Sequence, residues 1–189
     1  RLGCPVLAVT REKSRVLVTT EAGVEAFDEI VFACHSGQAL AVLTDASSAE
    51  REVLGAMGYS RNEVVLHQDT SVMPVRPKVW ASWNYHAPLG ASRASLTYYM
   101  NRLQGFESNQ PVLVTLNDVG SIDESLVLKR LHYEHPVFDA AMLKAQGRHA
   151  EISGVDRTHY CGAYWRYGFH EDGVVSGLRV VEALVANCD

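Results

Sequence analysis

The sequence has no long apolar run, no excess of basic residues and few cysteines. None of its apolar stretches approaches the ~18 residues that a membrane-spanning helix needs, so no transmembrane segment is predicted. A net charge of -5 leaves no basic stripe for nucleic acid. The four cysteines are scattered and the N-terminus lacks the parts of a signal peptide, which predicts free thiols in a cytoplasmic protein.

The chain is nevertheless rich enough in apolar residues to fold. Its 189 residues are 47% hydrophobic, which suits one large domain or two small ones. It begins with Arg1 rather than Met, and an apolar run starts almost at once. We therefore expect it to be a piece of a longer protein.

The first third of the sequence predicts strands followed by short helices. Three β-branched runs bounded by charge or glycine, at 5–12, 14–21 and 24–34, are typical of a meander. The third run ends in EIVFAC, an apolar stretch typical of a strand in a parallel sheet. QALAVL at 38–43 and AEREVLGAMG at 49–58 predict helices, the second capped within 45–48.

The middle of the sequence predicts an antiparallel sheet. Long strands are expected at 62–69, 78–86, 94–102 and 111–118, and alternation within WASWNYH and LTYYMNR gives one aromatic face and one polar face. A further strand at 126–135 is broken by Pro136, and a helix is expected at 138–149.

The last thirty residues carry the most specific pattern. An apolar strand ends at Cys161, a glycine-rich aromatic loop follows, and Asp172-Gly173 is expected to open an amphipathic helix with Asp172 as its cap. The positive end of such a helix is available to an electron-rich ligand group. The alternative is an ordinary capped helix that packs Val174, Leu178, Val181 and Leu184 on a core.

Three segments in chain order resemble the flavin-containing amine oxidase superfamily, and especially bacterial proteins of the NAD/FAD-binding, amine-oxidase-like kind. They are GCPVLAVTREKSRVLVTTEAGVEAFDEIVFACHSGQALAVL, then MPVRPKVWASWNYH with LTYYMNRLQ, and then HPVFDAAMLKAQGRHAEISGVDRTHYCGAYWRYGFHEDGVVSGLRVVEAL. The resemblance spans nearly the whole chain. The GxGxxG turn that receives the pyrophosphate is missing, so the chain resembles the C-terminal half of such a protein.

This resemblance implies a mixed α+β and α/β fold. An antiparallel substrate-side sheet with helices would occupy 46–154, and parts of an FAD-binding, Rossmann-like domain would occupy 1–45 and 155–189. It also implies cofactor contacts made largely by backbone: Val6 at the adenine edge, Ala33, Cys34 and neighbouring His35 beside the dinucleotide, Gly162 and Ala163 at the ribityl chain, and Gly173, Val174 and Val175 at the flavin ring.

Aromatic residues supply the candidate substrate site. Rings can cage a cationic amine by cation–π attraction of ~0.5 to 2 kcal/mol each, or they can pack as sheet core. The candidates are Trp83, Tyr85, Tyr98, Tyr99, Asn101 and Tyr164. Enzymes of this superfamily often place a lysine near the flavin, and Lys78 is the candidate here, although its flanks suit a solvated strand entrance.

Other chemistry has less support in the sequence. His132 and His135 are three residues apart on an expected strand and point to opposite faces, so no metal site is predicted. His159 and Cys161 lack a third group that would orient a nucleophile.

We therefore expect part of an FAD-dependent oxidoreductase whose flavin takes a hydride from a small-molecule amine, with the fragment alone inactive. Two alternatives remain open. One is a flavoenzyme that desaturates or isomerises a lipid or isoprenoid chain. The other is a non-catalytic binding or dimerisation fragment, whose partner would be the missing N-terminal half or a second copy.

Overall fold

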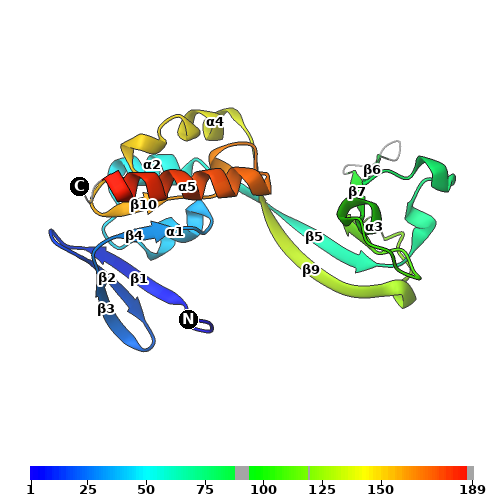
Figure 1. Ribbon diagram of the computed structural model, residues 1–189, viewed down its shortest axis with the longest axis horizontal. Coiled ribbons are helices and arrows are strands. Elements are labelled where there is room, and N and C mark those ends of the chain that lie inside the picture. Colours follow the sequence, from blue (N-terminus) through cyan, green and yellow to red (C-terminus); the bar gives the residue numbers. More distant parts are fainter. Residues whose placement is uncertain (88–93, 119, 187–189) are drawn as a thin grey trace. The chain divides into compact units, whose positions relative to one another are not determined.

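The computed structural model describes residues 1–87, 94–118 and 120–186, and divides the chain into two compact units (Figure 1). Unit 1 combines residues 1–59 with 136–189, and unit 2 is residues 60–135. The predicted domains divide at 45 and 154 instead. The segments 46–59 and 136–154 belong to the compact body of unit 1 because α2 (Ser48–Gly55) and α4 (Ala140–Gln146) pack against each other there.

Unit 1 begins with the expected antiparallel meander. Strands β1 (Val6–Arg11), β2 (Val16–Thr20) and β3 (Gly23–Phe27) pair in sequence order, with an irregularity in β1 after Val6. The chain then forms β4 (Ile30–Phe32), α1 (Ser36–Val42) and α2. The cap of α2 is Ser47, within the expected range 45–48, and Glu50 completes it: the Glu50 N–H donates to Ser47 Oγ at 3.2 Å, and the Ser47 N–H donates to Glu50 Oε2 at 2.7 Å.

Segments far apart in the sequence meet in a parallel strand pair. β4 pairs with β10 (Thr158–Tyr160), in the register Ile30↔Thr158 and Phe32↔Tyr160. This confirms the parallel strand expected from EIVFAC. The rings of Phe32 and Tyr160 stack with centroids 5.4 Å apart inside the core of unit 1. After β10 come the 3-10 helix η5 (Ala163–Trp165) and α5 (His170–Ala186).

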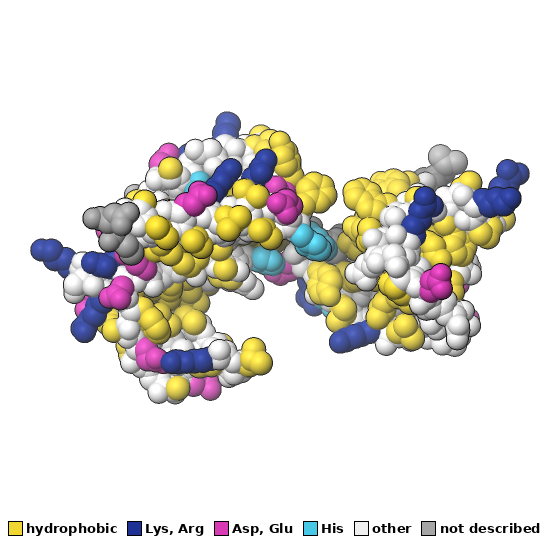
Figure 2. Space-filling view, viewed as in Figure 1, with side chains coloured by type: hydrophobic (Ala, Val, Ile, Leu, Met, Phe, Trp, Pro, Cys, Tyr) yellow, Lys and Arg dark blue, Asp and Glu magenta, His cyan; other side chains and the backbone are white. Residues whose placement is uncertain are grey.

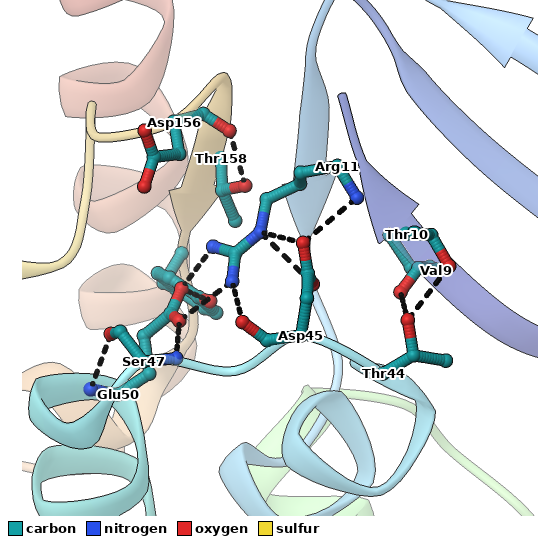
Figure 3. A network of polar contacts seen from close by, with 10 residues as sticks. Val9, Thr10, Arg11, Thr44, Asp45, Ser47, Glu50, Asp156 and Thr158 are labelled. Carbon is teal, nitrogen blue, oxygen red and sulfur yellow. Dashed lines mark hydrogen bonds and ion pairs between the residues drawn. The ribbon is translucent and has the colours of Figure 1, made fainter. Parts of the chain in front are cut away.

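A buried ion pair joins three elements of unit 1 (Figure 3). Arg11 of β1 donates two hydrogen bonds to Glu50 of α2, at 2.6 and 2.9 Å, and its guanidinium also contacts Asp45. Tyr160 of β10 donates its hydroxyl to Glu50 at 2.6 Å. Burial alone would raise the pKa of the Glu50 carboxyl, but hydrogen bonds from Arg11, Tyr160 and Ser47 hold it at about 2.

Unit 2 is built on a five-stranded sheet in the order β6-β7-β8-β5-β9. Its strands are β5 (Tyr59–His67), β6 (Trp83–His86), β7 (Ser95–Tyr99), β8 (Leu113–Leu116) and β9 (Val127–Pro136). The first residue of β5 and the last residue of β9 belong to unit 1. The pairs β6–β7, β7–β8 and β5–β8 are antiparallel, as expected. Short 3-10 helices η1 (Thr70–Val72), η2 (Pro77–Val79) and η3 (Glu124–Leu126) connect the strands.

Two expected strands are shorter than the alternation predicts. The strand expected at 94–102 ends at Tyr99, and α3 (Met100–Gln104) follows because Gly105, at φ 67°, closes a helical turn and Asn101 accepts a hydrogen bond from the Val112 N–H. The strand expected at 78–86 begins only at Trp83, because Pro77 opens η2 instead.

Candidate functional site

The carboxyl ends of β4 and β10 lie at the same edge of the parallel pair. The Cys161 N–H donates to the Phe32 carbonyl at 3.0 Å, so the chain leaves both strands side by side, through Ala33-Cys34 and through Cys161-Gly162. Ligands of α/β proteins bind at this edge of parallel strands. Two segments assigned to cofactor binding from the sequence therefore meet in unit 1.

The backbone at Gly162 is specialised. Gly162 has φ 155°, and a Cβ there would lie 2.4 Å from the Tyr164 ring, so only glycine fits. Its N–H donates to Ser176 Oγ of α5 at 3.0 Å. A Cβ at Gly173 would lie 3.9 Å from Ala163, so the start of α5 packs beside η5. The structure thus brings Gly162, Ala163 and Gly173 together.

The start of α5 lies earlier than the sequence predicts. The helix begins at His170, and the Gly173 N–H already donates to the Phe169 carbonyl at 3.2 Å. Asp172 is therefore inside the first turn rather than at its cap. It is buried, and its carboxylate accepts the N–H groups of Tyr167 at 3.2 Å and Phe169 at 3.0 Å. The N–H groups free for a ligand belong to the first turn, ahead of Gly173.

The outer face of α5 is apolar and exposed. Side chains at spacings of four, three and four residues form one stripe, which we call the α5 stripe; it consists of Val174, Leu178, Val181 and Val185, each between 55% and 61% exposed. Figure 2 shows hydrophobic side chains gathered over α5. The sequence-based alternative that packed Val174, Leu178 and Val181 on a core is wrong for this chain, because Ser176 and Val180 face inward instead.

Aromatic side chains adjoin the strand edge. His35 stacks on Tyr59 with ring centroids 4.3 Å apart, and Tyr59 meets Tyr164 edge-on at 6.5 Å. The Ser36 N–H at the start of α1 donates to the Tyr59 hydroxyl at 3.1 Å. Tyr59 was not among the residues singled out from the sequence. Its place at the start of β5 gave no local signal, because the nearest of these partners, Ser36, is 23 residues away.

The two thiols at this edge are protonated at neutral pH. Burial raises the pKa of Cys34 and of Cys161 above the ordinary thiol value. Burial also raises the pKa of the Tyr164 hydroxyl. The edge therefore presents neutral groups and backbone to a ligand rather than an activated nucleophile.

Not every predicted cofactor residue joins this edge. Val6 begins β1 and pairs with Thr20, so it belongs to the meander sheet. Val174 is an exposed member of the α5 stripe, and Val175 is half-buried on the same helix.

The aromatic face of the unit 2 sheet is open. Trp83 lies opposite Tyr98 with ring centroids 6.2 Å apart, and Tyr85 lies opposite Leu96 on the same face. Trp83 is 58% exposed and Tyr85 is 73% exposed. Neighbouring Val114 and Leu116 of β8 continue this apolar face. The alternation therefore identified three of the predicted substrate residues as one surface.

The other predicted substrate residues are dispersed. Tyr99 lies on the opposite face of the sheet, where it meets Trp80 edge-on at 5.4 Å. Asn101 is in α3 and binds Ser108 and Val112. Tyr164 is buried in unit 1, and Lys78 is exposed in η2.

The polar face of the same sheet is the buried one. The Asp69 N–H donates to His67 Nδ1 at 3.2 Å, so His67 Nε2 carries the proton and donates to Thr115 Oγ1 at 2.7 Å. Thr115 in turn bonds Thr97 at 2.8 Å. Burial lowers the pKa of the His67 imidazole, which keeps it neutral.

A pocket of about 490 Å³ opens at one end of the unit 2 sheet. Its lining is Ser60, Arg61, Asn62, Tyr85, Ala94, Leu96, Leu116 and Asn117. In the described part of the chain, no group of three or more His, Cys, Asp and Glu side chains could hold a metal ion. Within the same residues, no helix has the length and apolar character needed to cross a membrane.

Known structures share this fold, although no protein-family model and no curated protein matches the sequence. A CLA-producing fatty acid isomerase from P. acnes has a TM-score of 0.65 at 15% identity, covering 95% of this chain and 47% of that one. A putrescine oxidase mutant with redesigned cofactor binding has 0.66 at 12%, covering 97% and 48%. Cyclohexylamine oxidase from Brevibacterium oxydans has 0.65 at 11%, with the same coverage.

These likenesses define the fold class. The chain has the mixed α and β fold found in oxidases that include amine oxidases and in a fatty acid isomerase. It spans about half the length of each of these structures.

Proposed function

We propose that this chain is part of an FAD-dependent oxidoreductase and that the β4–β10 edge meets the flavin. The observation that carries the proposal is the meeting of Ala33-Cys34, Gly162-Ala163 and the first turn of α5 at one strand edge. Small side chains there let backbone approach a flat ring closely. The shared fold with solved oxidases supports an enzymatic parent.

When bound, a flavin would supply the hydride acceptor. The residues of this chain would bind and orient it. The first turn of α5 would direct N–H groups at an electron-rich edge of the ring, and Ala163 would leave room for the ribityl chain. Neutral thiols at Cys34 and Cys161 would avoid placing a negative charge beside it.

The rest of the cofactor site would come from elsewhere in a longer protein. The phosphate-binding turn is missing from these 189 residues, and the chain spans about half of its structural neighbours. We propose that 1–45 and 155–189 complete a Rossmann-like domain with that missing half, that 46–154 serve the substrate, and that the α5 stripe packs against the missing half.

Flavin binding by the longer protein tests this proposal. Purified with added FAD and then desalted, it should retain flavin absorbance at about 450 nm. Ala163→Leu should abolish this absorbance by filling the space beside Gly173, whereas Ala41→Leu, on the exposed side of α1, should leave it unchanged. Thermal unfolding of both variants separates loss of the site from loss of the fold. A wild-type protein that never retains flavin would overturn the proposal.

A non-catalytic docking module is the second candidate, and the exposed α5 stripe favours it. Light scattering on this chain distinguishes the outcomes. A dimer that Leu178→Lys converts to monomer would support self-association, and a monomer unaffected by Leu178→Lys would not.

A further inference from the structure

Strands β4 and β10 bond each other through alternate residues. The Ile30 N–H donates to the Arg157 carbonyl at 2.9 Å, and the Cys161 N–H donates to the Phe32 carbonyl at 3.0 Å. In a parallel pair, a residue that bonds the neighbouring strand directs both its N–H and its C=O toward that strand. Val31, between Ile30 and Phe32, therefore directs both groups away from β10.

The side of β10 that faces away from β4 is already hydrogen-bonded. Thr158 exchanges two hydrogen bonds with the backbone of 154–155, at 2.8 and 3.0 Å. The Tyr160 N–H donates to Ser153 Oγ at 3.2 Å, and the Tyr160 carbonyl accepts from His149 Nε2 at 2.8 Å. A further strand would have to break these bonds to pair with β10.

The corresponding side of β4 is open. In the part of the chain that the structure describes, neither the N–H nor the C=O of Val31 has a hydrogen-bond partner. The Val31 side chain is 41% exposed, and Ala33, two residues later, is exposed as well. The segment IVFAC has no charged residue and no proline that would keep another strand from pairing with it. We call the outward N–H and C=O of Val31 the open side of β4.

The two strands present determine the direction of a third. Each is followed by a helix, β4 by α1 and β10 by α5, which is the order typical of parallel sheets in α/β proteins. Two strands alone are marginally stable, and parallel strands usually belong to larger sheets that are covered on both faces. A third strand at the open side of β4 would therefore run parallel to β4.

We propose that the open side of β4 accepts a parallel, apolar strand from the missing half of the longer protein. The chain covers only 47–48% of each structure that shares its fold, so a protein of that length has a second half to supply the strand. Backbone hydrogen bonds to Val31 provide the pairing, and Val31 and Ala33 favour apolar neighbours. That the enlarged sheet holds a cofactor rests on the proposed function, whereas the pairing does not.

Amide hydrogen exchange, resolved by residue, compares this chain with the longer protein. The Val31 N–H should exchange freely in this chain and at least about 100-fold more slowly in the longer protein. The Phe32 N–H faces β10 and should be protected in both, which makes it the internal control. Free exchange of Val31 in the longer protein, or its protection in this chain when dilute, would overturn the proposal. Protection that appears only when this chain is concentrated would assign the open side of β4 to a second copy, and would overturn it too.

Two substitutions separate the backbone contact from the side chain. Val31→Pro removes the outward N–H and none of the bonds to β10, whereas Val31→Ala keeps that N–H. Both should shift the unfolding midpoint of this chain similarly, but Val31→Pro should lower that of the longer protein by at least about 2 °C more than Val31→Ala. Equal shifts in the longer protein would exclude a hydrogen bond to this N–H.

Flavin retention is measured on the same samples of the longer protein. Slow exchange of Val31 without retained flavin would refute the proposed function and leave the strand pairing in place. Retained flavin with free exchange of Val31 would do the reverse.

Discussion

The two units connect their strands through different buried polar groups. Unit 1 buries charge: Arg11, Glu50 and the Tyr160 hydroxyl form a hydrogen-bonded ion pair between β1, α2 and β10. Unit 2 joins neutral groups across its sheet, with His67 bonded to Thr115 between β5 and β8, and the carboxylate of its buried Asp69 accepts the N–H groups of Ser71 and Asp123. Removing either partner of a buried ion pair leaves the other charge unpaired and lowers stability strongly. Hydrogen-bonded neutral side chains lower stability mainly when one of them becomes protonated.

Removing the charge of Glu50 should have the largest effect. Glu50→Gln leaves Arg11 with a weaker buried partner and should lower the free energy of unfolding of unit 1 by about 3–5 kcal/mol. Urea unfolding followed by hydrogen exchange measures it. Glu52→Gln, which loses only the exposed contact to Arg148, should cost less than about 1 kcal/mol. Similar losses in both variants would show that burial of the pair contributes nothing.

Breaking the hydrogen bond between His67 and Thr115 in unit 2 should lower the free energy of unfolding by a smaller amount. Thr115→Val keeps the side-chain volume but leaves the His67 Nε2–H without its acceptor, which should cost about 1–3 kcal/mol. The matched control is Thr70→Val, at an exposed position of η1. Exchange protection should fall in β5, β7 and β8 and stay unchanged in α5, and a loss confined to unit 1 would contradict this assignment.

Lowering the pH should increase the difference in stability between the two units. The pKa of His67 is lowered in the folded state, so the unfolded chain binds the proton first and unit 2 loses stability as pH falls below about 6.5. The pKa of Glu50 is lowered to about 2, so its contribution persists until pH falls below the ordinary value of 4.5.

Half-buried His149 of unit 1 complicates this contrast. Burial lowers the pKa of His149, which bonds the Tyr160 carbonyl at 2.8 Å. The comparison is therefore made in His149→Gln, whose amide can replace that donor. Exchange between pH 7 and 5 should then rise in unit 2 before unit 1, and simultaneous loss would mean that the units unfold as one.

The smallest expected change is a gain in stability. A Cβ at Gly177 of α5 meets nothing within 4 Å, so Gly177→Ala should stabilise unit 1 by about 0.5–1 kcal/mol. The matched control is Gly162→Ala, which should lower stability because its Cβ would collide with the Tyr164 ring. If Gly177→Ala raises the unfolding midpoint of unit 2 equally, the two units share one transition.

Local pattern predicted much of the fold. Long-strand segments located β5 and β8, an apolar run identified β4 as a parallel strand, and a cap expected within 45–48 marked the start of α2. Alternation missed α3, because a helical turn closed by Gly105 depends on a contact between Asn101 and distant Val112.

The candidate site depended more on distant contacts. The resemblance selected Gly162, Ala163 and Gly173, which the fold brings together, and their role with a cofactor stays a prediction. Tyr59 at the strand edge was not singled out, because its ring partners His35 and Tyr164 lie far along the chain. Sequence likewise gave no indication that the polar face of the unit 2 sheet would be the buried one.

Strand β9 has a consequence for self-association through the backbone. It is ten residues long and lies at one edge of the unit 2 sheet, where a second chain could add a strand. Lys129, Arg130 and Glu134 along it, and Pro136 at its end, make that addition unfavourable through charge and a missing N–H donor. The protein can therefore keep an open apolar face on this sheet while its edge resists growth into fibrils.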